Sequence, residues 1–216
     1  MTRSPGGLDL AEAMTVAARE LHGSTTPGAT LDTAVRLAVR LLPGAEHAGV
    51  CELERGEELR TVAWSDDLVR EAGTPDLPHW ERLWTSPVVR VADSVGAEGE
   101  RQELRSVLSM RLRADKRRLT VLTAYSRKPG AFDETAARLG RLFTAHVSLA
   151  LNSVTVREQL TEAMHTRDLI GQATGVLMER LDIDAQAAFE SLVRASQREN
   201  IKLRDLARRI VGATDD

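Results

Sequence analysis

The sequence predicts an α+β fold that ends in a bundle of helices, and two observations carry this expectation. Short apolar runs typical of strands fill the middle of the chain, between residues 48 and 126, whereas apolar residues at helical spacing dominate both ends. From residue 133 one helical pattern continues to Leu181 without a proline. We therefore expect an N-terminal domain with a central antiparallel sheet, a long connecting helix and a C-terminal three-helix bundle.

Two amphipathic helices are expected before the strands, at residues 8–21 and 31–42, the second with Thr30 as its N-cap. The expected strands are residues 48–54, 59–65, 88–91, 107–113 and 119–126, of which the first two form a hairpin. Short helices are expected at residues 66–72 and 98–104. Trp80 and Trp84 lie one helical turn apart in the loop-like segment 75–87.

The long helix, residues 133–181, carries a heptad pattern. Positions from Leu139 to Leu177 are spaced alternately three and four apart, which is typical of a coiled coil. We expect the helix to pair with its copy in a homodimer. The expected seam residues are Leu142, Leu149, Val156, Leu160 and Ala163. The alternative is a domain helix and a separate bundle helix that keep the same phase by chance.

Two further helices are expected in the last thirty-five residues. Asp184 is a suitable N-cap for a helix that continues to Arg198 and turns Phe189 inward. Asn200 is expected to start the last helix, which Gly212 would end.

The composition favours a protein without catalytic machinery. The net charge of −3 argues against coating nucleic acid by bulk charge. The one cysteine, Cys51, lies in a strand-like run, allows no internal disulfide and fits a reducing cytoplasm. No two of the five histidines have metal-ligand spacing, and no phosphate loop is found. We therefore expect no enzyme activity, no identifiable cofactor or metal, and no membrane span.

The C-terminal segment combines cations with uncharged polar residues. Between Arg194 and Arg209 six Lys or Arg face only Glu199 and Asp205, a local charge of +4. The segment is explained either by a solvated face with i,i+4 ion pairs or by an anion-binding face.

Residues 157–211 resemble the ANTAR family, small helical RNA-binding modules. The resemblance is carried by Arg167, Ile170, Gln172-Ala173, Gly175, Leu177-Met178, Ala188-Phe189, Leu192, Ser196, Asn200, Leu203 and Ala207. It departs at Thr174, where the family usually has lysine, which puts one phosphate contact in doubt. The residues that the resemblance and the local chemistry lead us to expect at RNA are Arg167, Gln172, Ala173, Gly175, Arg180, Ser196, Gln197, Asn200, Lys202 and Arg204.

Residues 28–152 resemble a GAF domain more loosely, through residues 106–112, 119–126 and 129–133. Such domains sense small molecules or act as dimerising cores. Trp80 and Trp84 are candidates to line a ligand pocket, and the alternative is that they belong to the core.

The two resemblances imply a transcription antitermination regulator that binds paired hairpins in nascent leader RNA. They also imply a division into residues 1–27, an N-terminal helix and linker; 28–152, a GAF-like sensor; and 153–216, an ANTAR module. Two other functions remain open, a helical tail that binds a protein partner and a helix-turn-helix that binds DNA.

Overall fold

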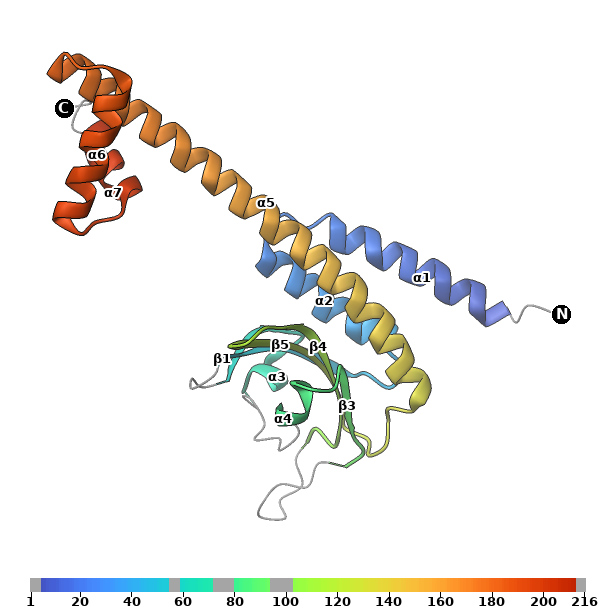
Figure 1. The fold of residues 1–216 in the computed structure, drawn as a ribbon. Helices are drawn as coiled ribbons and strands as arrows, with labels where there is room; N and C mark the ends of the chain where they lie inside the picture. Colours follow the sequence, from blue (N-terminus) through green and yellow to red (C-terminus); the bar gives the residue numbers. More distant parts are fainter. Residues whose placement is uncertain (1–4, 55–58, 72–79, 94–102, 213–216) are drawn as a thin grey trace. The chain divides into compact units, whose positions relative to one another are not determined.

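The computed structural model describes residues 5–54, 59–71, 80–93 and 103–212 (Figure 1). The chain divides into two compact units, Met1–Thr155 and Val156–Asp216, hereafter the first and the second unit. The elements in chain order are α1 (Pro5–His22), α2 (Pro27–Leu41), β1 (His47–Glu54), β2 (Arg60–Trp64), α3 (Asp67–Glu71), α4 (Trp80–Leu83), β3 (Val88–Val91), β4 (Ser106–Ala114), β5 (Arg118–Ser126), α5 (Glu134–Leu181), α6 (Ala185–Glu199) and α7 (Leu203–Gly212).

The first unit is built on a five-stranded antiparallel sheet in the order β2-β1-β5-β4-β3. The predicted α+β fold is thus confirmed, as is the hairpin of β1 and β2. The expected helix at 98–104 lies mostly outside the described residues.

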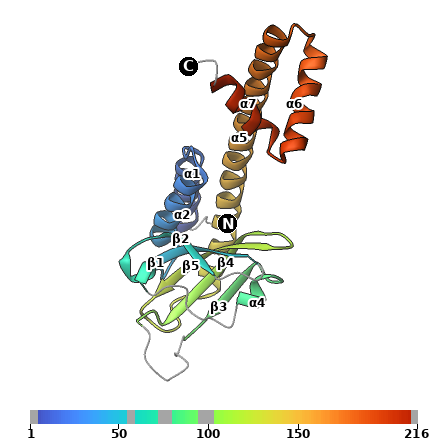
Figure 2. The same ribbon diagram turned by 90° about the vertical axis from the view of Figure 1, so that its left-hand side faces the viewer.

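Each face of this sheet has its own core. Helix α2 and the first part of α5 cover one face, with α1 packed against α2, and α3 and α4 cover the other face (Figures 1 and 2). Side chains alternate along the strands, so that Leu108 and Met110 of β4 face the first group of helices while Val107 faces the second. Both faces of the sheet are therefore closed by packed side chains.

The start of α2 corrects one prediction. Thr26, and not Thr30, is its N-cap: the Thr26 hydroxyl accepts a hydrogen bond from the Ala29 N–H at 3.2 Å. Pro27 can occupy the first helical turn because the N–H that it lacks has no helical partner there. Thr30 is buried in the helix, and its hydroxyl donates to the Thr26 carbonyl at 2.9 Å.

Helix α5 is seated directly on strand β4. A Cβ on Gly140 would clash with the Met110 side chain, so glycine lets the helix approach the strand this closely without a shift of Met110. A β-bulge interrupts the pairing of β4 with β5 at Leu112. The Leu112 carbonyl instead accepts a hydrogen bond from the Ser148 hydroxyl of α5 at 2.8 Å.

The second unit is a bundle of the last part of α5 with α6 and α7. Its buried core consists of Ala173, Leu192, Leu206 and Ala207. Asp184 is the N-cap of α6, as predicted, and accepts from the Ala187 N–H at 2.8 Å. The prediction for Asn200 was wrong, because Asn200 does not start a helix. It ends α6 in a left-handed conformation (φ 54°, ψ 38°), which asparagine tolerates better than most residues, and α7 begins at Leu203.

The continuous long helix is confirmed, but the heptad positions do not all share one environment. Ile170 and Leu177 pack against the core of the second unit. By contrast, the five expected seam residues, Leu142, Leu149, Val156, Leu160 and Ala163, are all exposed on the single chain. The candidate seam is therefore the stretch from Leu142 to Ala163. Among the described helices, none is both long enough and apolar enough to cross a membrane.

Candidate nucleic-acid interface

Five of the residues expected at RNA lie on α5, and they do not share one face. Successive residues of an α-helix are rotated by about 100°, so Arg167 lies about 140° around the helix from Gln172 and from Arg180, and Arg180 lies about 80° from Gln172. Gln172 and Gly175, three residues apart, do share a face, and both are exposed. A Cβ on Gly175 would meet nothing within 4 Å, so packing inside this unit does not require glycine there.

Ala173 is removed from the expected interface. Its side chain is 0% exposed and packs in the core of the second unit, so it cannot touch RNA. Thr174, which stands where the family usually has lysine, is half-buried and donates its hydroxyl to the Ile170 carbonyl at 2.8 Å. Both positions support the helix and offer no free group to a ligand.

The turn between α6 and α7 is held by its own hydrogen bonds. The Ser196 hydroxyl donates to the Ile201 carbonyl at 2.6 Å, and the Ile201 N–H donates back to the Ser196 carbonyl at 3.1 Å. The Asn200 N–H donates to the Gln197 carbonyl at 3.3 Å. The hydrogen bonds of Ser196 therefore stabilise the turn, whereas the side chains of Gln197 and Asn200 are exposed.

The cations around this turn fall into two groups. Arg194, Arg204 and Arg208 pair with Glu190, Glu162 and Asp205 at 3.2–3.5 Å, and Arg198 lies 3.9 Å from Glu199. Arg204 thereby ties α7 to α5, which leaves its charge partly compensated. In the described part of the chain, Lys202 and Arg209 have no acidic partner within 4.0 Å.

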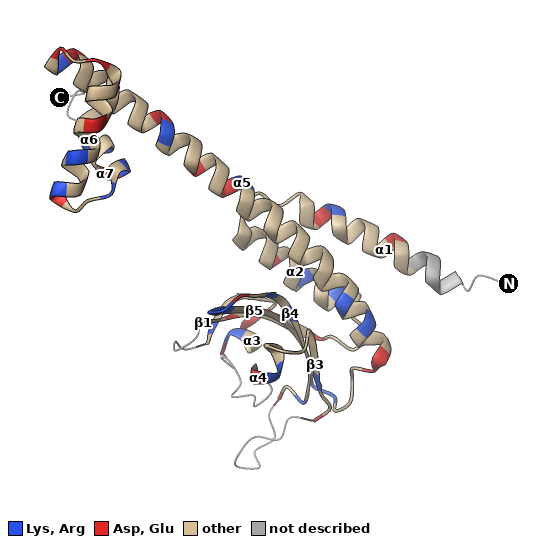
Figure 3. Cartoon of the chain, viewed as in Figure 1, with Lys and Arg blue, Asp and Glu red and all other residues tan. Residues whose placement is uncertain are grey.

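Figure 3 shows how these charges are arranged along the unit. Basic positions gather toward the end of α6 and in α7, and acidic ones are found near the turn between α5 and α6. Gln197, Asn200 and Lys202 are thus all exposed within six residues at the turn between α6 and α7. This combination suits a phosphate-bearing ligand that also offers polar edges.

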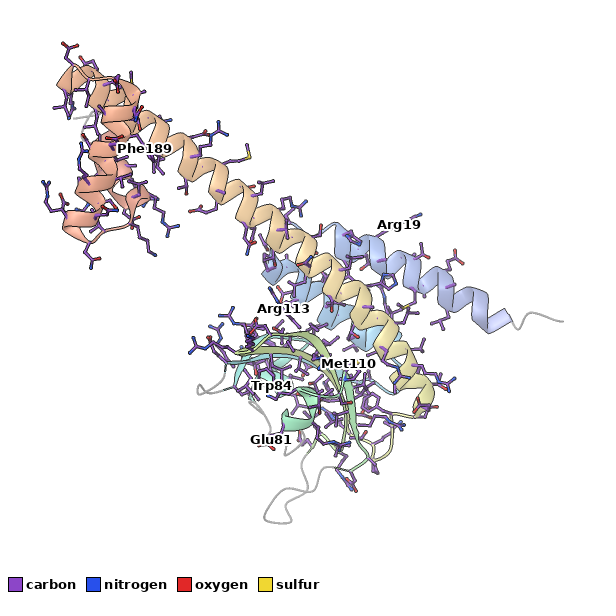
Figure 4. All side chains as sticks on the ribbon, in the orientation of Figure 1. Arg19, Glu81, Trp84, Met110, Arg113 and Phe189 are labelled. Carbon is purple, nitrogen blue, oxygen red and sulfur yellow. The ribbon has the colours of Figure 1, made fainter. Side chains whose placement is uncertain are left out.

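Phe189 is the residue that sequence reasoning placed wrongly. It was expected in the core, but its side chain is 44% exposed on α6 (Figure 4). The signal was present in the spacing: Ala188, Leu192 and Ala195 recur at i, i+4 and i+7 and form the inward face. Phe189 lies about 100° around the helix from Ala188, at the edge of that face.

In the first unit, one of the two tryptophans can be placed. Trp84 is half-buried and packs against the core between the sheet and α3 and α4. Arg111 of β4 donates to the carbonyls of Leu83 and Trp84 at 3.1 and 3.0 Å, which fixes the end of α4. The side chain of Trp80 lies outside the described residues.

Polar groups are buried on the same face of the sheet. The hydroxyls of Ser109 and Thr123 lie 3.2 Å apart, and the Cys51 sulfur lies 3.5 Å from the Thr61 hydroxyl. Burial raises the pKa of the Cys51 thiol and, together with the nearby Cys51, the pKa of the Tyr125 phenol. Both groups are therefore neutral, and the buried, protonated Cys51 thiol is a poor nucleophile.

Comparison with known proteins assigns both units. Residues 24–152, more than half of the chain, match the GAF domain family, and residues 158–211 match the ANTAR domain family. No curated protein sequence matches the chain.

Solved structures share the fold of the first unit at low sequence identity. The photosensory core module of a phytochrome from Stigmatella aurantiaca has a TM-score of 0.62 at 10% identity over 88% of this chain and 45% of that one. Free methionine-R-sulfoxide reductase from Neisseria meningitidis has a TM-score of 0.53 at 18% identity over 73% and 96%. The GAF domain of a phosphoenolpyruvate-protein phosphotransferase from Acinetobacter has a TM-score of 0.53 at 15% identity over 71% and 97%.

The chain spans less than half the length of the phytochrome structures that it resembles. GAF and ANTAR domains are typically regulatory modules, one sensory and the other RNA-binding. The chain therefore belongs to the family of regulators that join a GAF domain, here residues 24–152, to an ANTAR domain, here residues 158–211.

Proposed function

We propose that this protein is a transcription antitermination regulator that binds paired hairpins in nascent leader RNA through its ANTAR domain. The bound RNA would be held in a form in which the terminator cannot pair. The observation that carries this proposal is the α6–α7 turn, at which the amides of Gln197 and Asn200 and the ammonium group of Lys202 are all exposed. Unpaired loop bases present edges for amides, and the flanking phosphates present charge for lysine.

The residues proposed to contact base edges, hereafter the reading residues, are Gln172, Gln197 and Asn200. Those proposed to bind phosphates are Arg167, Arg180 and Lys202. Gly175 is proposed as a place of close approach, because its open surface has no Cβ to keep a ligand away. Ser196 and Arg204 are proposed to position the turn and α7, since their polar groups are engaged within the unit.

A pair of hairpins is best bound by a pair of ANTAR domains, because linked sites raise the effective concentration of the second contact. We propose that two chains join through the stretch of α5 from Leu142 to Ala163. Leu149 and Leu160 in this stretch are 59% and 62% exposed on the single chain. Large apolar side chains in a row at heptad spacing are typical of a helix whose partner is another helix.

The GAF domain is proposed as the sensory or dimerising part, with 28–152 as its extent and 153–216 as that of the RNA-binding part. Helix α5 belongs to the sequence of both. Because α5 packs against β4 at Gly140 and is hydrogen-bonded to it through Ser148, a change in the conformation of the sheet would shift the helix.

The test is binding of the purified full chain to tandem six-base-loop hairpins and to double-stranded DNA of equal charge. We expect preference for the RNA and an affinity that falls linearly with salt on logarithmic axes. Lys202→Ala should reduce that slope by about 0.7–0.9, the share of one phosphate contact. Arg208→Ala is the matched control, because Arg208 is paired with Asp205 and should change the slope less.

Asn200→Gly separates reading from folding. Glycine adopts the left-handed conformation of Asn200 without strain, so the turn should keep its stability. If Asn200 reads a base edge, the variant should lose about 1–3 kcal/mol for the cognate loop and little for a scrambled one. Equal loss for both loops would remove Asn200 from the reading set.

The two rival functions predict other outcomes. A helix-turn-helix protein would prefer the duplex DNA, but Leu206 and Ala207 of the short helix α7 are buried, which leaves a narrow face for a groove. A protein-binding adaptor would bind neither nucleic acid above the level set by its charge.

A further inference from the structure

The surface of α6 around Phe189 is unlike the rest of the second unit. Phe189 is the unit's one aromatic residue. Its ring is not part of the bundle core, although apolar residues at the neighbouring positions Ala188 and Leu192 are fully buried. Exposing an aromatic ring to water forgoes the free energy of its burial, so an occupant that covers the ring would recover it.

The residues that share this face are uncharged. Gln186, Val193, Ser196 and Gln197 all lie within about 80° of Phe189 around the helix. The acidic neighbour Glu190 is compensated: it accepts from the Gln186 amide at 3.2 Å and pairs with Arg194 at 3.5 Å. The face therefore combines one flat apolar ring with amide groups and places no uncompensated negative charge beside them.

The Phe189 ring also lies on the same helix as the proposed reading residue Gln197. Gln197 follows Phe189 by eight residues, about 12 Å along the helix axis. That separation exceeds the size of one base, so the ring and the Gln197 amide would contact different nucleotides. The cations Arg198 and Lys202 lie at the same end of α6 as Gln197, where a phosphate backbone would be held.

We infer that Phe189 stacks against an unpaired base of the bound RNA, at a nucleotide other than the one that Gln197 and Asn200 read. The inference rests on the proposed RNA-binding function and adds a second, stacking subsite to it. Every base has a flat π face, so this contact adds affinity for an unpaired nucleotide without selecting its identity.

A protein partner fits this face less well. Phe189 and Val193 are the apolar residues larger than alanine that remain at least partly exposed on this face, whereas a standard protein interface buries about 800 Å² on each side around an apolar centre. The exposed apolar stripe of α5 has that character, and the face of α6 does not.

The test places 2-aminopurine, one loop position at a time, in the tandem hairpins. With the wild-type chain, we expect protein-induced quenching at one position through stacking. Phe189→Leu keeps an apolar side chain but removes the π face, so that quenching should be lost and affinity should fall about 5- to 150-fold. Phe189→Trp should restore both.

An abasic sugar at the quenched position closes the test. The wild-type chain should lose affinity for the abasic RNA by the same factor, and Phe189→Leu should lose nothing further on it. Leu181→Ala is the control, because it removes another apolar side chain of this unit that is 55% exposed, and it should leave the quenching intact.

The outcomes separate the inference from the function on which it rests. If Phe189→Leu binds the hairpins as tightly as wild type with unchanged quenching, the stacking subsite is wrong while RNA binding stands. If the wild-type chain does not distinguish hairpins from duplex DNA, the proposed function fails. If Phe189→Leu instead dissociates the dimer in sedimentation, a second copy of this chain covers the ring and the inference is overturned.

Discussion

The first unit closes both faces of a sheet with large side chains, whereas the buried residues of the second that the structure describes are two leucines and three alanines. The first buries a few polar groups, as in the Ser109–Thr123 contact, and the second exposes Gln172, Gln197 and Asn200. A small bundle with so few buried side chains depends more on its helix caps and on the Ser196–Ile201 hydrogen bonds of its turn than a sheet covered by helices on both faces does. The difference teaches that the second unit has little packing to spare, and its exposed polar residues suit the proposed role in RNA binding.

The largest effect is expected where α5 exposes apolar residues in both units. Leu149→Asp with Leu160→Asp should weaken the proposed dimer by several kcal/mol, because paired helices would bury unpaired charges. Sedimentation of the full chain measures this. Thr161→Asp with His165→Asp is the control, since both residues are exposed about 100° and 140° around the helix from Leu160. A double leucine variant that sediments as the wild-type dimer would exclude this seam.

The next prediction compares the two cores by the same substitution. Leu192→Ala in the second unit and Leu37→Ala in the first each remove a buried leucine, which typically costs about 2–5 kcal/mol. A unit of about 60 residues has a total free energy of unfolding of roughly 3–9 kcal/mol. Leu192→Ala should therefore bring the second unit close to unfolding, while Leu37→Ala leaves the larger first unit folded. Hydrogen exchange resolved by unit would contradict this comparison if the second unit kept its protection.

Sequence reasoning succeeded where a pattern is local and repeated. The strands, the long helix and the Asp184 cap follow from alternation, unbroken helical spacing and a suitable capping residue, and all were placed within a few residues. It failed for Asn200 because asparagine suits both ends of a helix: it can cap the start with its side chain or end the helix in a left-handed conformation.

The environments of single side chains were harder to predict, because they depend on which helices meet. Ala173 and Phe189 both belong to family-like pairs, yet one is buried and the other exposed. The heptad pattern had the same limit. Ile170 and Leu177 fit the repeat, but the folding back of α6 and α7 turns them toward the bundle.

Glycines sharpen the contrast between the units. Gly44 in the first unit has a φ of 86°, and a Cβ there would lie 2.4 Å from the Ala131 carbonyl oxygen. Gly44→Ala should cost at least about 1–2 kcal/mol for the backbone alone. Gly175 in the second unit faces open space, so Gly175→Ala should stabilise the helix by about 0.5–1 kcal/mol.

The substitution of Gly175 should also change RNA binding. Gly175→Ala should weaken the affinity for hairpins while it raises the thermal stability, because a methyl group would occupy the proposed place of close approach. Gly171→Ala, at an equally open position one helical turn away on the same side of the helix, tests how far this place of close approach extends. Tighter binding of Gly175→Ala, in step with its stability, would assign Gly175 no part in the interface.

The smallest expected effect is on how the unfolding free energy of the first unit depends on pH. The Glu46 carboxylate accepts from the Ser126 hydroxyl at 2.7 Å and from the Arg127 N–H at 2.6 Å, and these bonds hold the pKa of Glu46 below its usual value. A lowered pKa in the folded state means that the carboxylate stabilises the fold above about pH 4.3, the usual glutamate value, and that this contribution is lost as the pH falls through the folded pKa. Because the group is largely exposed, the contribution should be below about 1 kcal/mol. Glu46→Gln keeps an acceptor oxygen but cannot titrate, so the unfolding free energy of the first unit should depend less on pH below 4.3. Glu179→Gln, which changes an exposed glutamate of the second unit, should leave that dependence in place, and an equal effect of the two variants would show that Glu46 contributes only its general charge.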